Sequence, residues 1–284
     1  MDAHTFLSRR RCLSTPTGEI ACTEFGEGPA ALFVHGLGTS GALWRQVIED
    51  MSGTSRCIAV DLPAHGASPA RPDMSPAALA EALAGLCDSL GLEQVDLVGN
   101  DTGGAIAQIF AARHPGKIRT LTLTNCECEG NFPPPDFAPV IEQARQGALA
   151  PLAAEIAAHP ETLSTYPPLI MGYQYPDRVP QDAWPDYATG VAGTIERARE
   201  FERLVASLDA ADIEAAGVQL RTLTAPTLVV WGTADTNFDV KWAYHLRELI
   251  PGAREVIEID GAKLFFPEER PEDLIPHLHR HWGR

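Results

Sequence analysis

The chain has 284 residues, a formal net charge of −16 and a hydrophobic content of 45%. This length suits one large domain or a domain that carries an insertion. The acidic balance argues against nucleic acid and against an anionic membrane surface as partners. The N-terminal segment does not resemble a secretory signal, and no apolar run reaches the roughly 20 residues of a membrane span. We therefore expect a cytoplasmic protein whose cysteines are reduced.

The first part of the chain predicts strands that alternate with helices. Thr17 and Gly18 separate two strands as a hairpin turn does, and Ser75 followed by Pro76 is typical of a helix start. Alternation at this spacing is typical of a mostly parallel sheet covered by helices on both faces. The expected strands are 11–15, 19–25, 30–34, 57–60, 95–98 and 118–124, and the expected helices are 42–51, 75–90 and 105–112.

The alternation stops near Cys126, and a Pro- and Gly-rich stretch at 130–135 follows. A helical pattern rich in Ala and Pro then extends to about residue 220, which predicts an inserted helical cap. The α/β pattern resumes with a strand near 226–232, a helix near 240–250, a strand near 254–259 and a helix from 271. The expected division is a core over 1–127 and 221–284, with a cap over 128–220.

The rest of the chain is organised around residues 97–104, which predict a strand, a tight turn and a helix. This context is typical of a nucleophile elbow, and the three glycines of the stretch allow a sharp turn and close packing. The central residue is Asp101, where Ser is usual. Its carboxylate would lie at the helix N-terminus, where backbone N–H groups favour an anion. A plain Asp N-cap is the alternative interpretation.

Over nearly its whole length the chain resembles the α/β-hydrolase superfamily, because it has five short motifs in the order and at the spacing found there. The motifs are 35–38, 61–66, the elbow, 231–235 and 267–271. With Asp at the elbow, the chain is most similar to haloalkane dehalogenases, fluoroacetate dehalogenases and soluble epoxide hydrolases. The resemblance implies the α/β-hydrolase fold, with a mostly parallel twisted sheet flanked by helices and an inserted helical cap.

The resemblance also implies a role for each matching residue. Asp101 would attack an alkyl carbon and form an ester, because a carboxylate is already ionised near neutral pH. The backbone N–H groups of Leu37 and Thr102 would form the oxyanion hole. Asp235 would be the acid that orients a base. The alternative acid position of the family holds Asn125, with Glu127 nearby.

The water-activating histidine of the family does not map onto this chain. Its slot is most simply Leu264, with Lys263 beside it. Lys263 could act as the base if burial lowered its pKa by several units. Thr102 and Leu37 also stand where many dehalogenases have the Trp and Asn that hold a halide. Dehalogenation is therefore disfavoured.

Epoxide opening would need acidic hydroxyls from the cap. The candidates are Tyr166, Tyr173, Tyr175 and Tyr187, of which Tyr173 or Tyr175 is preferred; the alternative is that these rings only line the pocket or the core. The residues expected to contact substrate are His35, Trp44, Asn100, Tyr173 and Tyr175. No dinucleotide fingerprint, phosphate loop or metal cluster is recognisable in the sequence, so we expect neither cofactor nor metal.

Three functions remain open from the sequence. The first is an epoxide-hydrolase- or dehalogenase-like hydrolase with Asp101 as nucleophile, acting on a small, largely apolar organic substrate. The second is a non-hydrolytic lyase, isomerase or cyclase with Asp101 as base beside the oxyanion hole, for which a water-activating His would be unwanted. The third is a catalytically inactive ligand-binding protein. A small-molecule substrate is the expected partner, and a homodimer is one option for the assembly.

Overall fold

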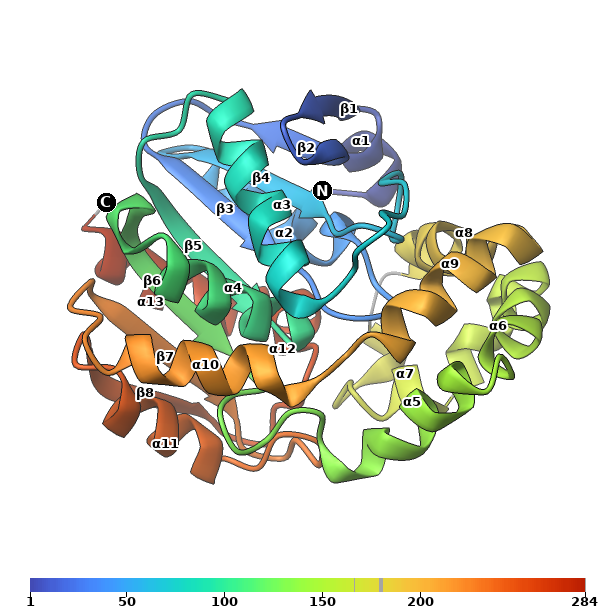
Figure 1. Cartoon of the computed structure of the whole chain (residues 1–284). Coiled ribbons are helices and arrows are strands. Elements are labelled where there is room, and N and C mark those ends of the chain that lie inside the picture. The colour runs from blue at the N-terminus through green and yellow to red at the C-terminus, as the bar shows by residue number, and fades with distance from the viewer. Residues whose placement is uncertain (166, 179–180, 284) are drawn as a thin grey trace.

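A twisted sheet of eight strands runs through the centre of the molecule (Figure 1). The computed structural model describes residues 1–165, 167–178 and 181–283. The strand order is β1-β2-β4-β3-β5-β6-β7-β8. β2 pairs antiparallel with β1 and β4, and all other pairs are parallel, which confirms the expected mostly parallel sheet. The strands are β1 (Arg10–Thr15), β2 (Gly18–Phe25), β3 (Ala30–Val34), β4 (Arg56–Asp61), β5 (Val95–Asn100), β6 (Ile118–Thr124), β7 (Thr227–Gly232) and β8 (Ala253–Ile259).

The central strands are buried along their whole length, as strands covered on both faces must be. Every residue of β3, β5 and β7 is buried, whereas the edge strand β1 leaves several side chains exposed. The continuous apolar runs in the sequence therefore correspond to the middle of the sheet.

Helices cover both faces of the sheet. On one face α3 (Pro76–Ser89), α4 (Thr102–Arg113) and α10 (Ala210–Leu220) lie side by side (Figure 1). On the other face α2 (Arg45–Met51) packs against α13 (Pro271–Trp282). α3 begins as predicted, because Ser75 Oγ accepts the Ala78 N–H at 3.3 Å and Pro76 is the first helical residue. The remaining core helices are α1 (Ala3–Leu7), α11 (Lys241–Leu249) and α12 (Phe266–Glu269).

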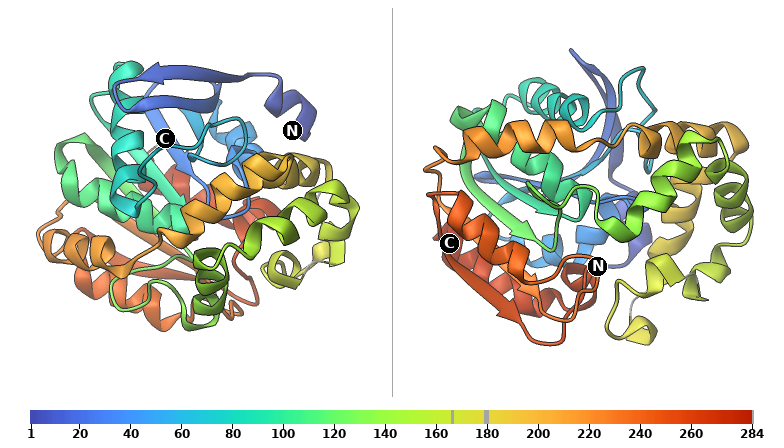
Figure 2. Two further views of the ribbon diagram at one scale, coloured as in Figure 1. Left: turned by 45° about the vertical axis from the view of Figure 1, so that its right-hand side comes forward. Right: turned by 60° about the horizontal axis from the view of Figure 1, so that its bottom comes forward.

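Five α-helices in the described residues between β6 and α10 form a separate lobe beside the core (Figure 2). Four of them, α5, α6, α8 and α9, pack on one another. None of the helices within the described ranges is long and apolar enough to cross a membrane. The cap helices are α5 (Ala138–Arg145), α6 (Leu149–Ala158), α7 (Pro167–Ile170), α8 (Trp184–Ala192) and α9 (Ile195–Ala206).

The end of the cap differs from the boundary that we expected at residue 220. α10 falls within 128–220, yet it packs against α4 and α3 and belongs to the helical layer of the core. The reason is its apolar stripe, in which Ile213, Ala216 and Leu220 are buried. A helical pattern alone does not tell which partner a helix covers.

The fold brings four segments to one edge of the sheet. β3, β5, β6 and β7 are consecutive neighbours and parallel, so their carboxyl ends lie side by side. In parallel α/β sheets this edge is where ligands bind. The loops that leave it carry Leu37, Asp101, Glu127 and Asp235.

Candidate active site

Asp101 occupies a sharp turn between β5 and α4, as the sequence predicts for an elbow. Its φ of +56° lies in the left-handed region, where a residue other than Gly costs about 1–3 kcal/mol. The backbone fixes the turn, because Asp101 N–H donates to Asn125 O at 2.9 Å and Gly104 N–H donates to Asp101 O at 2.8 Å. Asp101 is the N-cap residue of α4 by position, but its side chain makes no N-cap hydrogen bond. Capping of the helix therefore does not explain the aspartate side chain.

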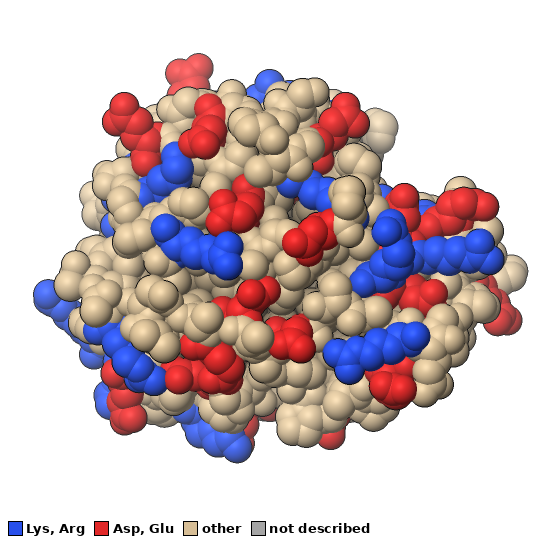
Figure 3. Space-filling model, viewed as in Figure 1, with Lys and Arg blue, Asp and Glu red and all other residues tan. Residues whose placement is uncertain are grey.

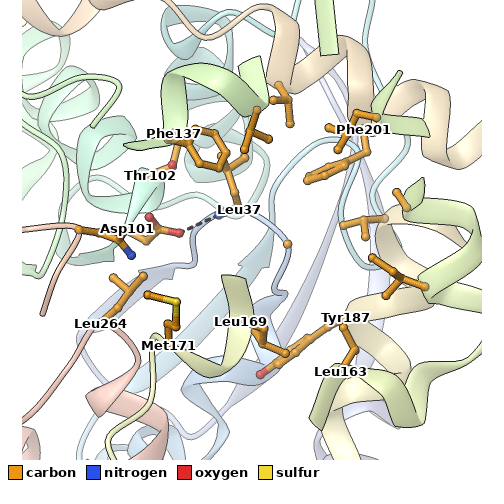
Figure 4. Close-up of a pocket in the computed structure, with 18 of the residues that line it drawn as sticks. Leu37, Asp101, Thr102, Phe137, Leu163, Leu169, Met171, Tyr187, Phe201 and Leu264 are labelled. Carbon is orange, nitrogen blue, oxygen red and sulfur yellow. Dashed lines mark hydrogen bonds between the residues drawn. The ribbon is translucent and has the colours of Figure 1, made fainter. Parts of the chain in front are cut away.

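The expected oxyanion-hole groups converge on the carboxyl group of Asp101 itself. Leu37 N–H donates to Asp101 Oδ2 at 3.1 Å (Figure 4), and Thr102 N–H also donates to this carboxyl. Gly36 permits the approach, since a Cβ at this position would lie 2.1 Å from Asp101 Oδ2. The reactive oxygen is thereby oriented, but both N–H groups are already in use.

A cavity of about 400 Å³ lies between this edge of the sheet and the cap. Asp101 and Thr102 stand at one end of it, and apolar side chains from the cap form most of the wall (Figure 4). No lining residue in the described part of the chain is basic or a histidine. The size and apolar wall are typical of a small-molecule site. Representative wall residues are Phe137, Leu163, Leu169, Tyr187, Phe201 and Leu264.

Burial and, to a smaller extent, the negative charge of Asp235 raise the pKa of Asp101 from 3.8 to about 7. The N–H groups of Thr102 and Leu37 oppose this rise by stabilising the anion. Asp101 therefore keeps its proton to a higher pH than an exposed aspartate does.

Asp235 lies just after β7 and is buried behind the cavity wall. Asn125 Nδ2 donates to Asp235 Oδ2 at 2.7 Å, and the N–H groups of Asn237 and Phe238 donate to Oδ1 at 2.8 and 3.2 Å. Burial raises the pKa of Asp235 to about 6 despite these donors. Asn125 and Asp235 are therefore hydrogen-bonded to each other, and Asp235 acts on Asp101 through its charge.

Leu264, which we expected in the position of the family's histidine, lines the cavity. Asn100 Nδ2 donates to Leu264 O at 3.0 Å and ties this loop to the end of β5. Lys263 is half-buried, and it is not one of the described residues that form the cavity wall. Its charge lowers the pKa of Asp235. A role of Lys263 as base remains a prediction that the cavity geometry does not favour.

The five residues expected to contact substrate do not line the cavity in the ranges that the structure describes. His35 is buried, donates from Nδ1 to Gly36 O at 2.7 Å and accepts the Leu62 N–H on Nε2 at 3.0 Å. Burial lowers its pKa to about 4, so the ring is neutral and structural. Trp44 packs in the core against Phe33.

The cap tyrosines have other partners than substrate. Tyr173 is buried and donates to Glu268 Oε2 at 2.7 Å, and Tyr175 is 39% exposed. Tyr187 does line the cavity, but its hydroxyl donates to Glu268 Oε1 at 2.9 Å. Tyr166 lies outside the described residues. The preference for Tyr173 or Tyr175 as epoxide-opening hydroxyls is thus corrected. The hydroxyl of Tyr173 contacts a buried carboxylate and Tyr175 is exposed to solvent, so neither lines the cavity among the described residues.

Glu127 is the site residue to which the sequence assigns no role. It lines the cavity, is 3% exposed and accepts the Thr102 hydroxyl on Oε1 at 2.9 Å. An acidic residue between two cysteines, directly after a buried strand, was the available signal, since buried acids are rare without a reason.

No group of three metal-ligating side chains occurs among the described residues.

Comparisons with known proteins bear on the whole chain. A family model described as alpha/beta hydrolase fold matches residues 29–270. Two curated relatives match about a third of this chain. Pimeloyl-[acyl-carrier protein] methyl ester esterase of Chromobacterium violaceum is 41% identical over 99 residues, which cover 34% of this chain and 37% of the relative. 2-Hydroxymuconate semialdehyde hydrolase of a Pseudomonas species is 38% identical over 103 residues, 34% and 36% of the two chains.

Solved structures match nearly the full length. Epoxide hydrolase CorEH superposes with a TM-score of 0.79 at 20% identity, covering 96% of this chain and 98% of that one. Haloalkane dehalogenase DbeA from Bradyrhizobium elkani gives a TM-score of 0.77 at 22% identity, covering 96% and 97%. At these identities the likeness is one of fold, and the chain spans just over a third of the two curated relatives above.

Proposed function

Because the chain belongs to the alpha/beta hydrolase fold family, we propose that it is an enzyme with Asp101 as its reactive carboxylate. Its substrate would be a small, neutral and largely apolar molecule. One observation carries this proposal. Asp101 stands at the head of an apolar cavity with Oδ2 fixed on the Leu37 N–H.

The charges at the cavity favour a neutral substrate. Asp101 and Glu127 form its polar end, and the exposed Asp136 lies at its wall. No described lining residue offers a positive charge. An anionic substrate would lose its hydration and meet like charge without a counter-ion, which is costly.

The reaction that this cavity supports best is a proton transfer without water. The cavity has no described histidine or basic residue in its wall that would activate water, and the resemblance puts Leu264 where the family has its imidazole. A base is most effective when its pKa lies near the working pH, and that of Asp101 is about 7. We therefore propose a lyase, isomerase or cyclase reaction in which Asp101 accepts the proton.

Covalent hydrolysis is the second candidate, and the acid pair favours it. The resemblance assigns the two acid positions to Asp235 and Asn125, which are hydrogen-bonded to each other, and the Leu37 N–H that donates to Asp101 would stabilise the oxyanion of an ester there. In this scheme Asp101 attacks an alkyl carbon and water then hydrolyses the ester. Lys263 would have to supply the base.

Isotope labelling separates the two candidates. A panel of neutral apolar epoxides, haloalkanes, lactones and enones would be incubated with the protein in water labelled with heavy oxygen and in deuterium oxide. We expect turnover without heavy oxygen in the product, and a loss of at least about 100-fold in Asp101→Asn. Heavy oxygen in the product would support hydrolysis instead. Full turnover by Asp101→Asn would remove both candidates.

A further inference from the structure

Glu127 has one carboxyl oxygen without a hydrogen-bond partner. Oε1 accepts the Thr102 hydroxyl at 2.9 Å, whereas Oε2 is buried and has no partner among the described residues. Glu127 shares the cavity wall with Asp101. A buried carboxylate oxygen left without a donor is unfavourable. Oε2 therefore carries a proton or meets a group of the bound substrate.

Two neighbouring carboxyl groups in an apolar site do not both ionise readily. Asp101 accepts the N–H groups of two other residues at the N-terminus of α4, which stabilise its anion, whereas Glu127 accepts the Thr102 hydroxyl and its own backbone N–H. The proton of the pair therefore resides on Glu127. Burial raises the pKa of Glu127 well above its usual range, and the charges of Asp101 and Asp235 raise it further.

The other titratable groups near Glu127 do not change this assignment. Burial raises the pKa of the thiols of Cys126 and Cys128, so both are neutral. Besides Asp101, the cavity wall contributes Asp136, which is exposed. No cation lines the cavity where the chain is described, so no positive charge there would stabilise an ionised Glu127.

We propose that Glu127 is a second catalytic residue, which donates the Oε2 proton to the substrate atom that gains negative charge while Asp101 acts. The inference rests on the proposed role of Asp101. Because the N–H groups of Leu37 and Thr102 hold Asp101 itself, the developing anion needs another donor. The Thr102 hydroxyl fixes the carboxyl group of Glu127 by donating to Oε1, and the buried, unpartnered Oε2 is the oxygen left to serve the substrate.

Two probes with the same six-carbon chain isolate this proton. With hexene oxide, an Asp101 oxygen bonds to a ring carbon, the ring C–O bond breaks, and its electron pair stays on the ring oxygen. That oxygen takes the proton from Glu127, which leaves a hydroxyalkyl ester on Asp101 and a carboxylate on Glu127. With hexyl bromide, the same oxygen displaces bromide, which leaves as an anion and needs no proton.

The experiment compares the rates of ester formation on Asp101 by intact mass and peptide mapping. We expect Glu127→Gln to slow the epoxide at least about 100-fold. The bromide rate should stay within about threefold, because Gln keeps the neutral charge and shape of the acid. Glu129→Gln is the matched control, since Glu129 pairs with Arg221 at the surface, and both rates should be unchanged.

Equal slowing of both probes in Glu127→Gln, or an unchanged epoxide rate, would overturn the role of Glu127. Absence of any label on Asp101 in the unmodified protein would overturn this inference, whereas the proposed function fails only if Asp101→Asn keeps full turnover in the isotope experiment above. If Glu127→Gln does not fold, the pH profile of the unmodified protein gives the answer. The epoxide rate should fall at high pH as Glu127 loses its proton, while the bromide rate keeps its plateau; parallel profiles would overturn the proposal.

Discussion

The side chain of Asp101 combines reactivity with a stability cost. Its position in a strained turn and a buried cavity is unfavourable for a carboxylate, as the rise of its pKa to about 7 shows. Proteins tolerate such costs at functional sites, where the surrounding structure enforces them. The same cost supplies a test that needs no substrate.

Asp101→Asn should stabilise the protein at high pH. A carboxyl group with a raised folded pKa contributes stability that is lost as pH rises from its usual value of 3.8 through about 7. The amide is neutral throughout and tolerates a positive φ. We expect the free energy of unfolding in urea to rise by about 3 kcal/mol at pH 8, and the gain to fade towards pH 4.

The control for this comparison is Asp239→Asn, because Asp239 is exposed in the loop after β7. It should leave the free energy of unfolding unchanged at either pH. If Asp101→Asn gave no gain at pH 8, or the same gain at all pH values, the buried carboxylate would not be the source.

At the scale of elements, a buried polar cluster ties the cap to the core. Arg45 pairs with Glu268, and Glu268 accepts the hydroxyls of Tyr173 and Tyr187 from the cap. The cap segment after α7 also contacts the loop that carries Leu264, since Phe265 N–H donates to Gly172 O at 2.9 Å. These contacts hold Leu264 and the cap wall on opposite sides of one cavity.

Substitutions in this cluster should lower the free energy of unfolding, and the loss should be larger when a buried charge loses its counter-charge than when one hydrogen bond is lost. Tyr173→Phe removes one hydrogen bond to a charged group and should cost about 1.5–3 kcal/mol in urea unfolding. Glu268→Gln leaves the Arg45 charge with weaker compensation and should cost about 3–5 kcal/mol. The matched control is Tyr244→Phe, whose hydroxyl bonds Glu258 at the surface. Equal losses of unfolding free energy in all three variants would contradict the role of this polar cluster in tying the cap to the core.

For the whole molecule, the architecture followed from local patterns. The apolar runs located the strands, and the motif spacing placed Asp101 after β5 and Asp235 after β7. What the sequence could not supply were contacts between distant residues. Asn125 and Asp235 are 110 positions apart, and Tyr173 and Glu268 are 95 apart. The period of a strand or helix gives the face of a side chain but not its partner across the fold.

The net charge of −16 also says little about the site. On the face in Figure 3, acidic and basic side chains lie interspersed. The substrate argument depends on the local cavity, in which two acids face an apolar wall. The chemistry therefore depends on which side chains the fold brings together at the cavity, and not on the net charge of the chain.

Labelling of the intact protein by hexyl bromide across pH tests the central claim most directly. A carboxylate that acts as a base or a nucleophile is also alkylated by an electrophile seated beside it. The account predicts a single adduct on the peptide that contains Asp101, with a rate that rises with pH and is half-maximal at about 7. Asp101→Asn should carry no adduct. Equal labelling of Asp101→Asn, or a single adduct on another residue, would contradict the account.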